Sequence, residues 1–135
     1  MYQTERAAMC HTAGRLVRVR CGAFRDVPTL LSTVVLDFEA GSWVLAVNAD
    51  DDTVLITDIT NAETTSLHDV YLADPPADSP WRLALGASAQ WVWILENQQG
   101  YADGIQFAFV RDGADVCHVQ LIAAASHWQV GVIRP

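Results

Sequence analysis

Two Cys-His pairs, Cys10-His11 and Cys117-His118, are by residue type the best candidates for metal binding in this sequence. Neighbouring residues of a strand point to opposite faces of a sheet, so Cys117 and His118 are not expected to reach one ion. Cys117 alternates in register with apolar residues, which predicts a buried thiol in its inert, protonated form. We therefore expect no metal site and no cysteine nucleophile.

An acidic run, Asp50, Asp51 and Asp52, could hold a hard cation through its carboxylates. The glycine and the terminal glutamate of an EF-hand loop do not follow at the required positions. Asn and Asp are common in turns, so an exposed hairpin tip explains the run more simply. Because GxSxG, phosphate-loop and HExxH motifs are also missing from the sequence, we favour a protein that is not an enzyme and expect no cofactor.

The stretch NQQGYADG, residues 97–104, connects two expected strands and is also a candidate binding loop. Its glycines and its Asp-Gly step suit a turn, but a simple hairpin needs only about two to five residues. The other side chains offer hydrogen-bond donors, acceptors and an amphipathic ring: Asn97, Gln98, Gln99, Tyr101 and Asp103. A structural turn and a recognition loop both remain open.

A second candidate surface follows from alternation in the C-terminal third of the chain. When the apolar residues face the core, the opposite face carries neutral hydrogen-bonding side chains: Gln106, His118, Gln120, His127 and Gln129. Such a face could line a groove for a polar ligand, with His118 or His127 as the acid or base of an undiscovered enzyme. The competing interpretation is an ordinary sheet face turned to water.

Strands must position these residues, because apolar side chains recur with a period of two along most of the chain. Residues 31–48 predict a half-buried strand and its hairpin partner, and TVLITDI at 53–59 predicts a third strand. Further strands are expected around the following segments: 15–21, 91–95, 105–109, 117–121 and 128–132. In the strand expected at 91–95, the residues Trp91, Trp93 and Leu95 share a face. RDGAD, residues 111–115, predicts a tight hairpin turn.

One short helix is expected near residues 80–85, where Ser79 is a suitable N-cap, Pro80 opens the helix and Gly86 follows its end. Together these signals predict a mainly β protein with roughly eight antiparallel strands, built as a sandwich or a strongly curved sheet. We expect one domain over residues 1–135, with residues 1–13 as a candidate flexible segment. A strand or a helical turn is expected at 67–72.

Composition limits the partners. The 135 residues are 51% hydrophobic and carry a formal net charge of −8, and all 8 basic residues are arginine. The negative electrostatic field of this charge repels phosphate backbones and anionic lipids, so we expect neither nucleic acid nor a membrane as partner. The same field attracts proteins with a basic surface. The N-terminus lacks the apolar core of a secretory signal, and three cysteines cannot all pair within one chain, which favours a cytoplasmic location.

A resemblance adds to this reading. The stretches LDFEAGSWVLAVNADDDTVLI and GASAQWVWILENQQGYADGIQFAF together resemble a small family of uncharacterised bacterial domains, with a WxW strand followed by NQQGYxDG. The likeness covers most of residues 14–111 and is less clear beyond them. It implies no known activity, but small acidic proteins of this type are suspected to be immunity proteins against toxins. The positions that would match a family site are Asp51, Asp52, Trp93, Asn97, Gln98, Gln99, Tyr101 and Asp103.

The sequence thus predicts a binding or interaction module, in its sharpest form an immunity-like protein that neutralises a basic partner by stoichiometric binding. Tyr101 and its neighbouring amides would be the anchor of such an interface, since tyrosine is favoured at binding hot spots. Two alternatives remain: a small-molecule binder or enzyme that uses the Gln and His face, and a structural homo-oligomer such as a homodimer.

Overall fold

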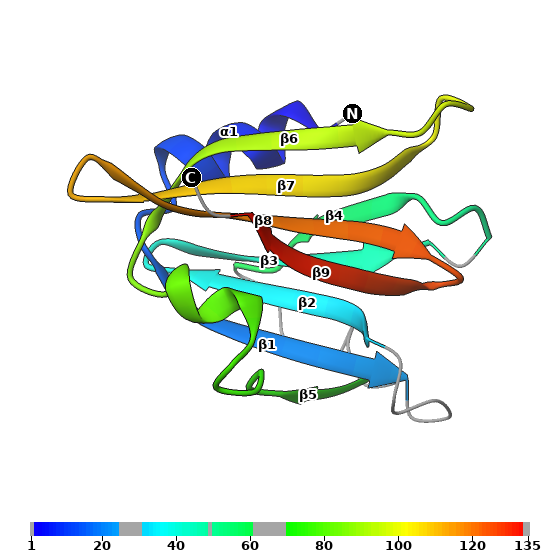
Figure 1. Ribbon diagram of the computed structural model, residues 1–135, viewed down its shortest axis with the longest axis horizontal. Helices are drawn as coiled ribbons and strands as arrows, with labels where there is room; N and C mark the ends of the chain where they lie inside the picture. The colour runs from blue at the N-terminus through cyan, green and yellow to red at the C-terminus, as the bar shows by residue number, and fades with distance from the viewer. Residues whose placement is uncertain (1, 25–30, 49, 61–69, 134–135) are drawn as a thin grey trace.

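Two antiparallel sheets packed face to face form a β-sandwich (Figure 1). The computed structural model of the chain describes residues 2–24, 31–48, 50–60 and 70–133. The predictions of a mainly β chain and of a sandwich are confirmed, with nine strands in the described residues where roughly eight were expected.

The first sheet has five strands in the order β4-β3-β2-β1-β5. Their bounds are β1 (Leu16–Phe24), β2 (Leu31–Phe38), β3 (Gly41–Val47), β4 (Val54–Asp58) and β5 (Val70–Ala73). The predicted hairpin and third strand are therefore confirmed. The prediction that β2 is a half-buried strand is wrong, because Thr33 and Val35 on its second face are buried as well. Of the expected element at 67–72, residues 67–69 lie outside the described residues.

The second sheet is a meander of four strands in the order β6-β7-β8-β9. They are β6 (Ser88–Glu96), β7 (Ala102–Arg111), β8 (Ala114–Ala124) and β9 (His127–Ile133). The predicted turn between β7 and β8 forms at Asp112 and Gly113, whose φ angles of 53° and 80° are those of a tight hairpin turn. Each strand therefore pairs with its neighbour in sequence.

The core lies between the inner faces of the sheets and contains the alternating apolar residues of both. Phe107, Phe109 and Leu121 of the second sheet are fully buried, as are Leu36 and Leu45 of the first. The Trp128 indole N–H donates a hydrogen bond to the Leu45 carbonyl oxygen at 3.2 Å. This bond links β9 directly to β3.

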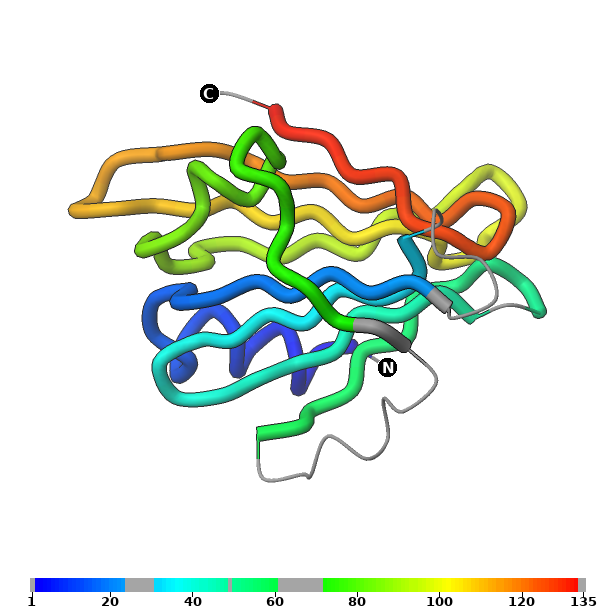
Figure 2. The backbone as a smooth tube through the Cα atoms, turned by 90° about the horizontal axis from the view of Figure 1, so that it is seen from below, coloured from blue at the N-terminus to red at the C-terminus, as the bar shows by residue number. Residues whose placement is uncertain are grey.

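Two short helical elements close opposite sides of the sandwich (Figures 1 and 2). Helix α1 (Gln3–His11) packs against β6 and β4 and buries Met9. The sequence pattern does not predict this helix, and it makes residues 1–13 a candidate flexible segment instead. The element expected near 80–85 is the 3₁₀ helix η2 (Pro80–Leu83), and its Trp81 is buried against Phe107 and Phe109. Ser79 precedes η2 but its side chain makes no capping hydrogen bond.

Candidate functional site

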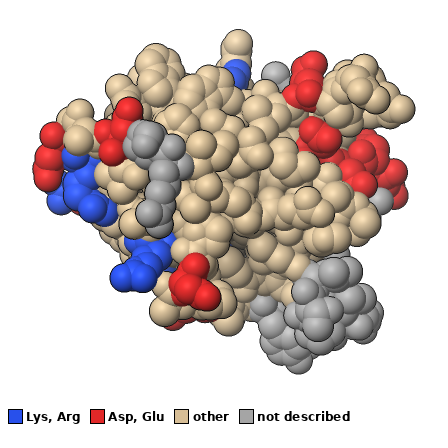
Figure 3. All heavy atoms as spheres, in the orientation of Figure 1, with Lys and Arg blue, Asp and Glu red and all other residues tan. Residues whose placement is uncertain are grey.

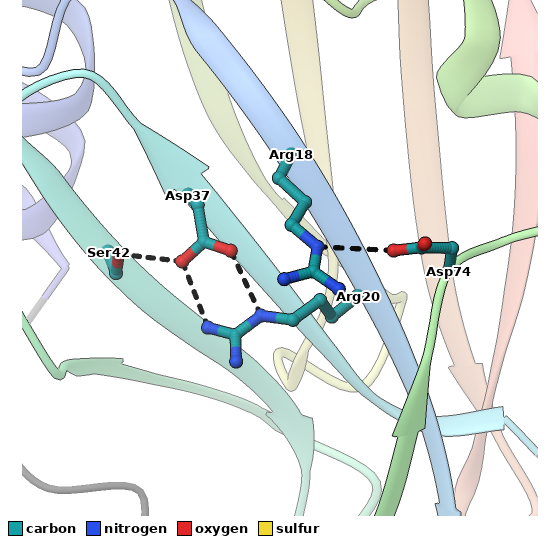
Figure 4. Close-up of polar contacts among 5 residues, drawn as sticks. All are labelled: Arg18, Arg20, Asp37, Ser42 and Asp74. Atoms are coloured by element: carbon teal, nitrogen blue, oxygen red, sulfur yellow. Dashed lines mark hydrogen bonds and ion pairs between the residues drawn. The ribbon is translucent and has the colours of Figure 1, made fainter.

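The outer face of the five-stranded sheet carries a closed polar network (Figure 4). The Arg20 guanidinium donates two hydrogen bonds to the Asp37 carboxylate, at 2.9 and 3.0 Å, and the Ser42 hydroxyl donates a third at 2.7 Å. Arg20 and Asp37 are half-buried, with 19% and 18% of their side chains exposed. Since each group already has its partners, the network joins β1, β2 and β3 and offers little to a ligand.

The outer face of the four-stranded sheet is different, because its residues stand in three registered rows without any Asp, Glu, Lys or Arg. The rows are Trp91–Ala108–His118–Ile133, Trp93–Gln106–Gln120–Gly131 and Leu95–Gly104–Ile122–Gln129. We call these twelve residues the neutral face. Figure 3 shows a broad uncharged expanse between charged groups at the two ends of the molecule.

Two contacts between side chains link residues of the neutral face. The Gln120 amide donates a hydrogen bond to the Gln106 carbonyl oxygen at 2.9 Å, and the rings of Trp93 and His118 lie with centroids 5.8 Å apart. At Gly104 an added Cβ would come within 2.8 Å of Ile122 and 3.1 Å of Leu95. Glycine at this position therefore leaves room for the side chains of Ile122 and Leu95.

The tryptophans of β6 face away from the core. Trp91 and Trp93 do share a face, but it is the outer one, where they are 58% and 39% exposed. The buried residues of β6 are Ala89 and Val92, with a register shift between Ala89 and Trp91. The neutral face therefore carries two exposed indole rings that the alternation alone assigned to no particular surface.

The polar residues predicted on this sheet are only partly brought together. Gln106, Gln120, His118 and Gln129 all lie on the neutral face. His127 of β9 pairs with Ala124, which is six residues along β8 from His118. Three pockets among the described residues have neither histidine in their lining. An acid–base pair of His118 and His127 is not assembled.

The loop at 97–101 holds itself in shape. The Asn97 side-chain oxygen accepts hydrogen bonds from the backbone N–H groups of Gln99 and Tyr101, at 2.9 and 3.2 Å, and the Asn97 amide donates to Asp103 at 3.3 Å. Gly100 has a φ of 85°, which favours glycine. Asn97 and Asp103 are thus structural, while Gln98, Gln99 and Tyr101 are exposed, the last by 48%.

The acidic turn between β3 and β4 lies at the same end of the sandwich as this loop (Figure 1). Asp51 accepts hydrogen bonds from the Thr53 backbone and hydroxyl, and Asp52 accepts one at 2.8 Å from the Ser126 backbone in the turn between β8 and β9. We call the acidic end the set formed by Asp50, Asp51, Asp52, Glu96 and Asp103. Figure 3 shows Asp and Glu gathered at this end, and most of the visible Arg at the other.

The cysteines give no sign of reactivity. Burial raises the pKa of the Cys21 thiol to about 11 and also raises the pKa values of Cys10 and Cys117. Within the described ranges, no group of three or more His, Cys, Asp or Glu residues is placed to hold a metal ion. No helix in the described part of the chain is long and apolar enough to span a membrane.

One site was missed by sequence reasoning altogether. A cavity of about 740 Å³ lies under residues 74–80, which connect β5 to η2 and which we call the strap. Its lining joins residues far apart in the chain, including Cys21, Trp81 and Val130. The local sequence signal is the group of prolines at positions 75, 76 and 80, which is typical of a loop and not of a binding site.

The architecture and these surfaces define a two-sheet antiparallel β-sandwich whose outer faces differ sharply in polarity. A family model matches residues 10–135, and the chain belongs to that family, which is described as a family of unknown function (DUF6334). The match extends past residue 111, where the resemblance had been less clear. Comparisons with curated proteins and with solved structures give no match.

Proposed function

We propose that this protein is a binding module that contacts a basic protein through the acidic end, with Tyr101 as anchor. The observation that carries the proposal is the loop at 97–101, whose own hydrogen bonds use Asn97 and Asp103 and leave Tyr101, Gln98 and Gln99 free at an acidic surface. A self-supported loop loses little conformational entropy on binding, which favours affinity.

The charge arrangement supports the same surface. Acidic residues from two turns lie at one end of the molecule, and the net charge of −8 adds a long-range attraction for a basic partner. Such complementarity mainly raises the association rate, whereas a buried aromatic anchor slows dissociation. Trp93 lies on the neutral face, two residues before Leu95 in β6. Its exposed ring extends the aromatic surface toward the loop at 97–101.

An immunity-like role is the sharpest form of this proposal: stoichiometric binding that covers the functional surface of a basic toxin. It requires no catalytic group, no metal and no cofactor. It agrees with the separation of His118 from His127, because the two imidazoles do not converge in one pocket of the described residues.

Affinity capture of the tagged protein from a lysate of its source, with salt varied, tests the proposal. We expect a salt-sensitive partner whose binding weakens by roughly tenfold or more in Tyr101→Ala, as for a hot-spot residue. The double variant Asp50→Asn/Asp51→Asn should slow association. Asp112→Asn/Asp115→Asn removes the same charge from the turn between β7 and β8 at the other end and is the matched control (Figure 1). Equal effects of the two double variants would refute the assigned surface.

A second candidate function is that of a homo-oligomer subunit. The neutral face favours it, because Trp91 is 58% exposed there and no charged side chain stands in the three rows. Sedimentation at increasing concentration should then show a growing mass, and Trp91→Lys should abolish that growth by placing like charges in the interface. A constant monomer mass for the unaltered protein would eliminate this candidate.

A further inference from the structure

The cavity under the strap opens to solvent and lies between β1 of one sheet and β9 of the other. Cys21 and Ala23 of β1 line it on one side and Val130 of β9 lines it on another. Trp81 of η2 and the strap residues Pro75 and Pro80 complete this part of the lining. The cavity is therefore bounded by both sheets and is separate from the acidic end and from the neutral face.

This space is a pocket that opens to solvent and is not a closed void in the core. Its volume of about 740 Å³ is within the range of small-molecule sites, which run from roughly 300 to 1,000 Å³. Small side chains such as Ala23, Gly22 and Ala73 line it, where larger ones would fill the gap between the sheets.

The lining also limits what can enter. Most of the wall is apolar, and burial raises the pKa of the Cys21 thiol to about 11, so this group is uncharged at neutral pH. Asp78 is the one ionisable carboxyl group of the lining, and it is exposed. Because a carboxylate at the opening and a net charge of −8 repel anions, fatty acids and phosphates are disfavoured.

From this geometry we infer that the cavity under the strap is a binding site for a neutral, largely apolar small molecule. Trp81 supplies an aromatic wall, Ala23 and Val130 make the apolar sides, and the ligand leaves through the side at which Asp78 and Ser79 meet water. This site does not depend on the proposed partner interface, since it shares no residue with the acidic end.

A pair of fluorescent probes tests the inference: N-phenyl-naphthylamine, which is neutral, and anilinonaphthalene sulfonate, which has a similar ring system but is an anion. We expect saturable binding of the neutral probe at one site, about tenfold or more tighter than that of the anion. Failure of the neutral probe to bind up to its solubility limit would overturn the proposal, as would equal affinity for the two probes.

A filled cavity locates the site. In Val130→Phe the larger ring should occupy the space and weaken binding of the neutral probe by about tenfold or more. Val110→Phe makes the same substitution on β7, whose residues do not line the cavity, and should leave binding unchanged. Circular dichroism on both variants shows that they are folded. Unchanged probe affinity in a folded Val130→Phe would overturn the assignment.

The cysteines provide a second measurement that needs no substitution. Iodoacetamide labelling at about pH 9, followed by peptide mass analysis, reports Cys21 and Cys10 separately. Saturating neutral probe should slow labelling of Cys21 several-fold and leave Cys10 unaffected, because only Cys21 lines the cavity. Equal labelling of Cys21 with and without the probe would contradict the site even if Val130→Phe fails to fold.

Discussion

The outer faces of the two sheets differ in how completely the chain satisfies them. On the five-stranded sheet, Arg20 and Asp37 form a two-bonded ion pair, and Val35 and Val44 are buried with Ile59 in a small cluster. On the four-stranded sheet, the neutral face leaves its tryptophans exposed and has one amide–amide hydrogen bond, between Gln120 and Gln106 of its middle row. The first face thus satisfies its central charged pair within the fold, whereas the second leaves large apolar side chains in contact with solvent.

The difference also shows how polarity can mislead. Charged residues are often taken as the sign of a functional surface, yet here the half-buried charges of Arg20 and Asp37 are fully used within the fold. The uncharged face carries the exposed rings of Trp91 and Trp93. A partner gains more free energy by covering this apolar and weakly hydrated surface than by competing for a completed ion pair.

Among the substitutions that test this difference between the two faces, Asp37→Ala should lower the free energy of unfolding the most. It removes the acceptor of three hydrogen bonds and leaves Arg20 half-buried without its carboxylate, so the free energy of unfolding should fall by about 2 kcal/mol. Urea unfolding measures it. Gln106→Ala, the matched change on the neutral face, should cost less than about 1 kcal/mol, since it loses one neutral hydrogen bond. Equal losses would show that the two faces are equally integrated.

The tryptophans of the neutral face should have smaller effects. Trp93→Ala should lower the free energy of unfolding by about 1 kcal/mol, because it loses the contact with the His118 ring and part of its buried area. Trp91→Ala should change it by less than about 0.5 kcal/mol, as is usual for exposed positions. Thermal unfolding of both variants measures the difference. A larger cost for Trp91 than for Trp93 would mean that the first ring is covered in solution.

The smallest effect should appear at the edge of the five-stranded sheet, in acid. Hydrogen bonds from the Thr60 hydroxyl and backbone lower the pKa of Asp58 below its ordinary value of 3.8. The resulting stabilisation is present above about pH 3.8 and is lost as the pH falls through the lowered folded-state value. Thr60→Val should move the pKa of Asp58 back up, as an NMR titration of its carboxyl would show. Thr57→Val is the control on β4, and a shift in this variant would contradict the assigned cause.

Local patterns predicted the parts of the fold that depend on neighbours in sequence. The hairpin of β2 and β3 and the polar residues Gln106 and Gln120 followed from the period of two, because alternate residues of a strand share a face. The same rule failed to orient Trp91, since both faces of β6 carry apolar residues and a register shift follows Ala89. The sequence does not predict helix α1, because no N-cap residue marks its start and only one of its residues, Met9, is buried in the structure.

Features that depend on distant contacts could not be read from the sequence. The separation of His118 and His127 depends on the register of β8 with β9, and the Asp52–Ser126 bond depends on two turns meeting at one end. The cavity needs Cys21, Trp81 and Val130 to come together around a gap, which no short-range pattern encodes. The loop at 97–104 stays a predicted binding site, and its exposed side chains include Gln98, Gln99 and Tyr101.

The position of β5 has a consequence for the order in which the molecule opens. Among the described strands, β5 is a four-residue edge strand whose one partner is β1, far away in sequence. In contrast, β2, β3 and β4 pair with their neighbours in sequence, as do all strands of the other sheet. Short edges with few partners open by local unfolding at a lower free energy than the core. Amide hydrogens of β5 should therefore exchange before those of β7 and β8, and a molecule could enter or leave the cavity under the strap while both meanders stay intact.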